Sequence, residues 1–161
     1  MNLEKYQQYS RIARGLEKAD LVLKDARIVN VFTEEIIRGD IAIQDGIIAG
    51  IGSFHGKEER DLAGRYVCPG FIDSHLHLES TLVTPAELVT AASRHGTTTF
   101  IVDPHESANV SGLAGIDYIL DQTEDVKANV YVMMPSCVPA TAIDDNGCTL
   151  TAEDMVPYLH N

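Results

Sequence analysis

Positive charge is scarce in this chain. Twelve Lys and Arg residues stand against 24 Asp and Glu residues, which gives a formal net charge of -12. The basic residues are scattered, whereas a nucleic-acid-binding surface needs clustered positive charge. The composition therefore excludes nucleic acid as the expected ligand, and the acidic surplus favours good solvation.

Cysteines and long apolar runs are also scarce. The three cysteines lack the spacing of a zinc ribbon or of a disulfide framework, so we expect reduced thiols. The first twenty residues have no apolar core of the signal-peptide type, and no later stretch is long and apolar enough to cross a bilayer. We therefore expect a cytoplasmic protein with no membrane partner.

The pattern of apolar residues changes after residue 65. Residues 2–19 predict a helix, and the following short β-branched runs, broken at Asp45-Gly46, predict antiparallel strands ending near residues 54–57. Beyond residue 65, predicted strands at 66–77, 97–104 and 128–136 alternate with helices at 84–96, 111–125 and from 151 onward. Alternation of this kind is typical of βαβ units and a parallel sheet.

These patterns predict an α/β fold with two parts. Residues 1–65 form the helix and the β-rich portion, and residues 66–161 form the first part of a TIM-like β/α barrel. A complete barrel takes about 250 residues. Because three βα units are visible, we expect the barrel in this chain to be incomplete.

A metal-binding motif follows the first barrel strand. The segment PGFIDSHLHLES, residues 69–80, places Asp73, His75 and His77 at two-residue spacing, so their side chains share one face of a strand. Two neutral imidazoles at a strand end suit a divalent transition metal, and we predict His75 and His77 as its ligands. Asp73 either orients an imidazole or accepts hydrogen bonds from backbone amides. Glu79 is expected to be a solvated loop residue.

Polar residues also follow the next two predicted strands. Asp103, His105 and Glu106 lie after the second strand, and Ser136 and Cys137 lie after the third. Functional groups gather at the carboxyl ends of strands in β/α folds. We predict that the Asp103–Glu106 cluster takes part in catalysis by binding substrate, relaying protons or supporting the metal. A polar turn that caps the next helix is the alternative.

Three segments, in this order, resemble adenine deaminases of the amidohydrolase superfamily: PGFIDSHLHLES, RHGTTTFIVDPHESANVSG and SCVPATAIDDNG. The resemblance implies a β/α barrel that carries a small β-sandwich. It also implies a metal site, typically manganese or iron, that uses His75 and His77. Imidazole accepts zinc as well. Water activated by the metal would convert adenine to hypoxanthine and ammonia.

The resemblance also implies that further metal ligands lie on later strands that this sequence lacks. Because two imidazoles alone hold a metal weakly, we expect the 161-residue chain by itself not to deaminate adenine. The unfinished barrel edge favours a homo-oligomer. Two alternatives stay open: another cyclic-amide amidohydrolase, similar to dihydroorotases or hydantoinases, and a non-catalytic truncated or split-chain subunit.

Overall fold

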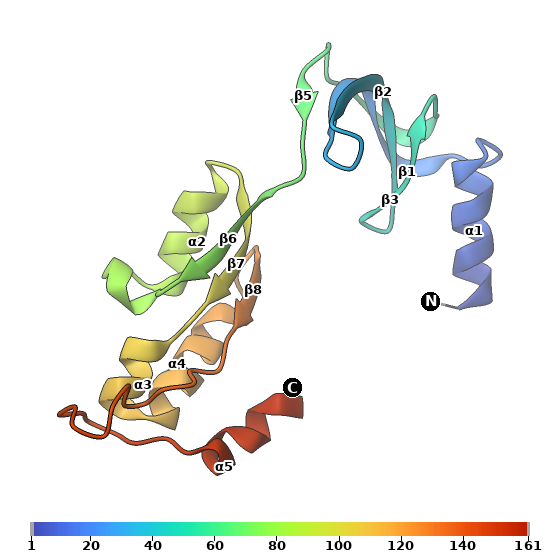
Figure 1. The fold of residues 1–161 in the computed structure, drawn as a ribbon. Coiled ribbons are helices and arrows are strands. Elements are labelled where there is room, and N and C mark those ends of the chain that lie inside the picture. Colours follow the sequence, from blue (N-terminus) through green and yellow to red (C-terminus); the bar gives the residue numbers. More distant parts are fainter. Residues whose placement is uncertain (1, 161) are drawn as a thin grey trace. The chain divides into compact units, whose positions relative to one another are not determined.

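The chain folds into two compact units that divide between Pro69 and Gly70. The computed structural model describes residues 2–160, which form a mixture of helices and sheets (Figure 1). In this part of the chain, no helix combines the length and the apolar character that crossing a membrane requires. The assignment of residues 1–65 and 66–161 to two domains of an enzyme stays a prediction.

The first unit is a helix and one mixed sheet. Its elements are α1 (Leu3–Ala13), β1 (Ala19–Asn30), β2 (Glu35–Gln44), β3 (Ile47–Gly52), β4 (Gly56–Asp61) and β5 (Tyr66–Val67). The sheet has the order β3-β2-β1-β4, and β5 also pairs with β1. The hairpins β1–β2 and β2–β3 are antiparallel as predicted, but β4 and β5 run parallel to β1. The antiparallel prediction is therefore confirmed for β1, β2 and β3, whereas the parallel strand β4 lies beyond the predicted segment and was missed.

The hairpin at Asp45-Gly46 is confirmed. Both residues have a positive φ, 51° and 75°, which matches the two central residues of a type I′ turn. The adjoining core is made by Ile12 of α1, Val22 of β1 and Phe54, which are all buried. The helix thus covers part of the sheet, where its apolar side is removed from water.

The single strand predicted over residues 66–77 is two strands in two different sheets. β5 ends at Val67 and pairs with β1, whereas β6 (Phe71–Leu76) pairs with β7 (Thr97–Val102). Pro69 has no N–H for a ladder bond, and a Cβ atom at Gly70 would lie 2.0 Å from Oγ1 of Thr98. The Pro-Gly pair therefore ends one sheet and lets the backbone pack closely at the start of the next.

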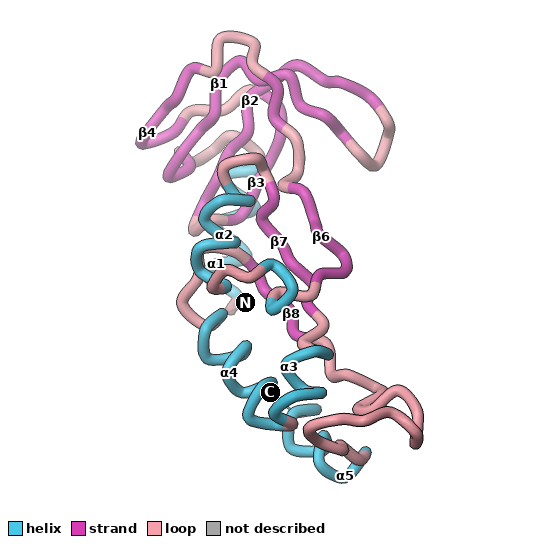
Figure 2. The backbone as a smooth tube through the Cα atoms, turned by 90° about the vertical axis from the view of Figure 1, so that its left-hand side faces the viewer, coloured by secondary structure: helices cyan, strands magenta, loops and turns pink. Residues whose placement is uncertain are grey.

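The second unit is built around a three-stranded parallel sheet with the order β6-β7-β8. Its other elements are η1 (Glu79–Thr81), α2 (Pro85–Ser93), β7 (Thr97–Val102), α3 (His105–Ser111), α4 (Leu113–Thr123), β8 (Asn129–Val132), α5 (Ala152–Met155) and η2 (Val156–His160). Helices α2 and α4 lie on one side of the strands (Figure 2). The predicted alternation of strands and helices is confirmed.

The core of this unit lies between the sheet and these two helices. Phe100 of β7 is 1% exposed and belongs to a buried cluster with Leu78, Val89 of α2 and Ile119 of α4. Thr84 caps α2 as predicted, because its Oγ1 accepts a hydrogen bond from the backbone N–H of Glu87 at 3.4 Å. The core and the cap together fix α2 over β7.

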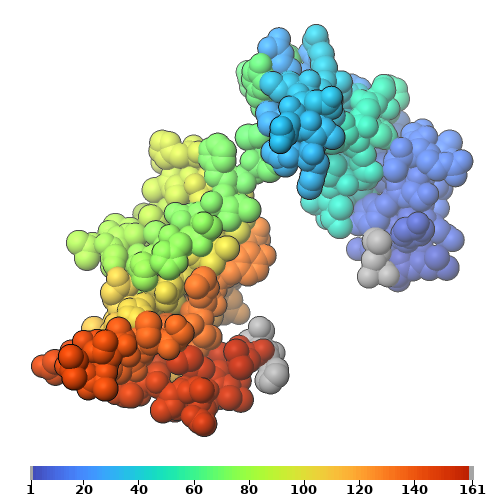
Figure 3. Space-filling view, viewed as in Figure 1, coloured from blue at the N-terminus to red at the C-terminus, as the bar shows by residue number. Residues whose placement is uncertain are grey.

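The segment after β8 packs at one end of the second unit. Figure 3 shows the deep orange and red atoms of this segment at the lower end of the second unit. Val138, Leu150 and Tyr158 pack there with Ala108 of α3 and Ile116 of α4. Within the predicted Asp103–Glu106 cluster, Asp103 and Pro104 precede α3, whereas His105 and Glu106 are its first two residues.

Replacing Phe100 with Ala should lower the stability of the second unit by about 3–5 kcal/mol, because it leaves a cavity among four buried side chains. Hydrogen exchange of the β7 amides measures this change. Phe71→Ala in β6 is the matched control: Phe71 is 60% exposed, and its loss should cost below about 1 kcal/mol. Equal losses for the two variants would contradict the placement of the core.

Candidate functional site

Parallel pairing of β6 and β7 brings the two polar motifs together. The pairing is irregular between Asp73 and Leu76, where the register shifts, and the last pair joins Leu76 to Val102. The backbone N–H of Asp103 then donates to the carbonyl of Leu76 at 2.8 Å. His77 and Asp103 are therefore the first residues beyond two neighbouring strands, at the carboxyl edge of the sheet.

Two imidazoles and one carboxylate form a compact donor group at this edge. The rings of His75 and His77 lie 4.9 Å apart between centroids, at an interplanar angle of 84°. One donor atom from each of His75, His77 and Asp103 lies within 4.8 Å of the others. His75 is exposed, whereas His77 and Asp103 are half-buried, so the group opens to solvent on one side.

The donor group fits a divalent transition metal. Oδ1 of Asp103 is buried and has no hydrogen-bond partner. A buried polar atom without a partner costs about 1–3 kcal/mol, and a bound cation removes such a cost. Imidazole nitrogen suits zinc and iron, and a carboxylate oxygen suits manganese and adds the negative charge that a divalent ion favours.

A second group of side chains adjoins the first through His77. Oε2 of Glu106 lies 2.9 Å from Nδ1 of His77. Oε1 of Glu106 accepts a hydrogen bond from Oγ of Ser80 at 2.9 Å, and Oε1 of Glu79 accepts one from the backbone N–H of Ser107 at 3.1 Å. One donor atom each from His77, Glu79 and Glu106 also lies within 4.8 Å of the others.

The two glutamates have opposite pKa shifts. Burial raises the pKa of Glu79, and the neighbouring Glu106 raises it further, against the lowering effect of the Ser107 N–H. Burial also acts to raise the pKa of Glu106, but hydrogen bonds from Glu79 and Ser80 outweigh it and leave this pKa below its usual range. The second carboxylate oxygen of Glu79, Oε2, is buried and has no hydrogen-bond partner.

Asp73 and Glu79 both accept hydrogen bonds from backbone amides. Oδ1 of Asp73 accepts one from the backbone N–H of His75 at 3.3 Å, which agrees with the backbone alternative, and its role in orienting an imidazole stays a prediction. The expectation that Glu79 is a solvated loop residue was wrong, since it is half-buried and bound to Ser107. Its signal in the sequence was the continued two-residue spacing after His75 and His77.

His105 lies at the start of α3, beside the third polar motif. Its Nδ1 is 3.9 Å from Sγ of Cys137, in the loop after β8. His105 is half-buried and Cys137 is exposed. All three strand ends therefore contribute polar side chains to the same edge of the sheet. His105 belongs to neither of the two donor groups, both of which contain His77.

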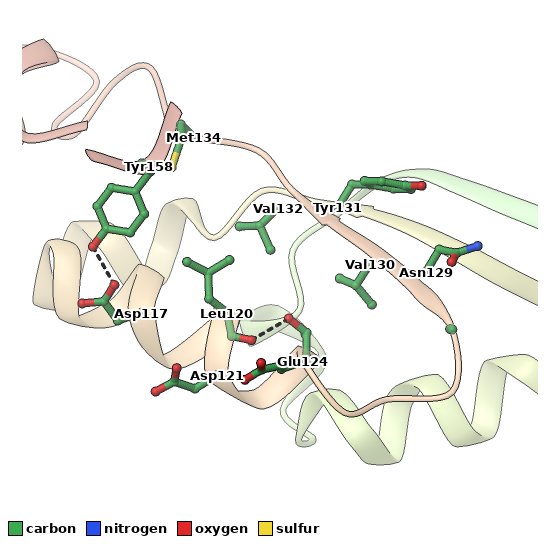
Figure 4. Close-up of a pocket in the computed structure, with 12 residues that line it drawn as sticks. Asp117, Leu120, Asp121, Glu124, Asn129, Val130, Tyr131, Val132, Met134 and Tyr158 are labelled. Atoms are coloured by element: carbon green, nitrogen blue, oxygen red, sulfur yellow. Dashed lines mark hydrogen bonds between the residues drawn. The ribbon is translucent and has the colours of Figure 1, made fainter. Parts of the chain in front are cut away.

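A cavity of about 970 Å³ lies elsewhere, between α4 and β8 (Figure 4). It is lined by residues of these elements, by Glu124, Ala128 and Met134 next to them and by Tyr158, and it includes none of the residues of the two donor groups. The Tyr158 hydroxyl donates to Oδ1 of Asp117 at 2.6 Å, and this hydrogen bond raises the pKa of Tyr158 to about 12. The cavity lacks the imidazoles needed for the chemistry at the strand ends, so we do not assign the site to it.

Comparison with known proteins places this arrangement in a family. The family model described as "Amidohydrolase family" matches residues 66–158, which include both donor groups. The chain belongs to the amidohydrolase family. The match begins at β5 and runs through all three strands of the parallel sheet.

Curated relatives are similar over the whole chain. An adenine deaminase from Desulfitobacterium hafniense is 56% identical over 161 residues, which are 100% of this chain and 28% of that protein. An adenine deaminase from Clostridium acetobutylicum is 53% identical over 143 residues, 89% of this chain and 25% of that protein. The chain thus spans about a quarter of the length of these relatives.

One solved structure shares the fold. It is an N-acyl-D-glutamate deacylase from Bordetella bronchiseptica, complexed with zinc and a phosphonate inhibitor. Its TM-score with this chain is 0.55 at 22% sequence identity, and the match covers 73% of this chain and 30% of that protein. At this identity the likeness supports the α/β architecture and carries no argument about substrate.

Replacing Asp103 with Asn should weaken binding of Co²⁺ or Zn²⁺ to this chain at least about tenfold, because the donor group loses its negative charge. Titration calorimetry measures the affinity. His95→Ala is the control, since His95 is exposed at the end of α2 and belongs to neither group. An unchanged metal affinity in Asp103→Asn would show that Asp103 is not a metal ligand.

Proposed function

We propose that this chain is part of a metal-dependent adenine deaminase that converts adenine and water to hypoxanthine and ammonia. The observation that carries the proposal is the donor group of His75, His77 and Asp103 at the ends of β6 and β7 in an amidohydrolase chain. The choice of adenine is supported by the two relatives that share more than half of their aligned residues with it.

The proposed site uses each residue in a defined way. His75 and His77 bind a divalent transition metal, manganese or iron by resemblance and zinc by the same nitrogen chemistry. Asp103, which the sequence analysis assigned to catalysis, is proposed as a third donor, because its carboxylate lies with the imidazoles. When bound, such a cation lowers the pKa of water and supplies a nucleophile near neutral pH.

The remaining polar groups are proposed to handle protons. Deamination needs a proton at the departing amino group, and a side chain at the strand edge must carry it. Oε2 of Glu106 lies 2.9 Å from Nδ1 of His77, and His105 lies at the start of the same helix with its Nδ1 3.9 Å from Sγ of Cys137. In this proposal Asp73 fixes the backbone at His75 through its hydrogen bond to the amide.

The wider setting of the enzyme is also a proposal. We propose that residues 1–65 and 66–161 belong to a small β-rich domain and to the first part of a β/α barrel, respectively. We further propose a cytoplasmic homo-oligomer that acts on a small purine and binds neither nucleic acid nor membrane. The acidic composition supports the exclusion of nucleic acid.

A chimera tests the proposed activity. Residues 1–161 replace the matching segment of the Desulfitobacterium hafniense relative, and ammonia release is followed with Mn²⁺ or Fe²⁺ present. We expect release from adenine and none from hydantoin or dihydrouracil. We expect no steady release from the 161-residue chain alone, because two imidazoles and one carboxylate leave much of a coordination shell to water.

Variants of the chimera connect the activity to the site. His77→Ala should lower kcat/KM for adenine by at least about a hundredfold, since it removes a member of both donor groups. His95→Ala, the exposed control, should leave kcat/KM unchanged. A chimera that prefers hydantoin, or a His77→Ala variant of full activity, would refute the proposal.

A further inference from the structure

Glu79 joins two segments that are far apart in the sequence. It opens the short helix η1 after β6, and its Oε1 accepts the backbone N–H of Ser107, the third residue of α3. The adjacent Ser80 makes a parallel connection, donating its hydroxyl to Glu106. Two consecutive residues after β6 therefore hold the first turn of α3, which carries Glu106.

This connection places the carboxylate of Glu106 next to the imidazole of His77. Oε2 of Glu106 lies 2.9 Å from Nδ1 of His77, while the N–H direction of the ring is not aligned for a full hydrogen bond. Catalytic hydrogen bonds are often misaligned without ligand and tighten when one binds. Glu106 has an exposed side chain, so it needs neighbours to stay in this position.

The position of the carboxylate decides which nitrogen of His77 is free. In a neutral imidazole one nitrogen carries the proton, and the hydrogen bond at one nitrogen sets the state of the other. A metal-binding histidine usually donates its second ring N–H to a carboxylate or a carbonyl. With a proton at Nδ1 facing Glu106, the lone pair at Nε2 of His77 is available to a cation.

We propose that Glu79 is a positioning residue that holds Glu106 against Nδ1 of His77 and so keeps Nε2 free for the metal. The inference rests on the proposed function only in taking His77 as a metal ligand. It differs from a direct role of Glu79, in which the group of His77, Glu79 and Glu106 would itself hold the cation.

The state of His77 can be measured without metal or substrate. In the chain labelled with ¹⁵N-histidine, at a pH above the ordinary histidine pKa of about 6.5, long-range ¹H–¹⁵N correlation reports which nitrogen carries the proton. The His77 signals are assigned by their loss in His77→Gln. We expect the proton at Nδ1 in the unaltered chain, and a His77 with its proton mainly at Nε2 would overturn the proposal without any variant of Glu79.

Two substitutions of Glu79 separate positioning from binding. In Glu79→Gln the amide oxygen still accepts from the backbone N–H of Ser107, so α3 stays in place and the proton on His77 and the Zn²⁺ affinity should stay within about twofold. Glu79→Ala removes the contact with Ser107, so the share of Nε2–H on His77 should rise severalfold and the Zn²⁺ affinity should fall about tenfold. Glu87→Ala in α2, an exposed residue, is the matched control.

Each outcome is decisive. Equal losses of Zn²⁺ affinity in Glu79→Gln and Glu79→Ala would show that Glu79 binds the cation itself, and an unchanged proton position in Glu79→Ala would show that it positions nothing. Hydrogen exchange of the β7 amides shows whether Glu79→Ala is folded. Because the proton position is read without adenine, an inactive chimera would contradict the proposed function and leave this result standing.

Discussion

The parallel pairing of β6 with β7 is the constraint on which the site depends. His77 and Asp103 are 26 positions apart in the sequence, and they meet because each follows the last paired residue of its strand. The buried cluster around Phe100 holds this pairing, since α2 and α4 pack against it from one side. The imidazoles therefore owe their mutual position to apolar packing behind the sheet rather than to contacts among themselves.

Much of the fold could be predicted because its signals are local. Asp45-Gly46 specifies its turn through two positive φ values, and Thr84 caps α2 through its own side chain. The break at Pro69-Gly70 was missed because the residues on both sides are apolar and read as one strand. Which sheet each half joins depends on pairing with β1 and β7, partners that the local sequence does not name.

In the candidate site, too, the local features could be predicted from the sequence and the long-range contacts could not. The two-residue spacing of His75 and His77 was enough to predict neighbouring rings, since a strand puts alternate residues on one face. The contact of Glu79 with Ser107 spans 28 positions and depends on where α3 begins, so no local pattern reports it. Asp73 illustrates the reverse case, because its backbone partner lies only two residues away.

Among the described residues, β6 and β8 each pair with β7 and with no other strand, so the outer side of each carries main-chain groups that lack a ladder partner. An edge strand of this kind can pair with a strand of another polypeptide. The surplus of negative charge opposes contact between copies at low ionic strength, and salt screens that repulsion within about 10 Å at 0.1 M. Two opposing effects therefore act on the association of copies of this chain. The unpaired main-chain groups of β6 and β8 favour it, and the repulsion between negative charges opposes it.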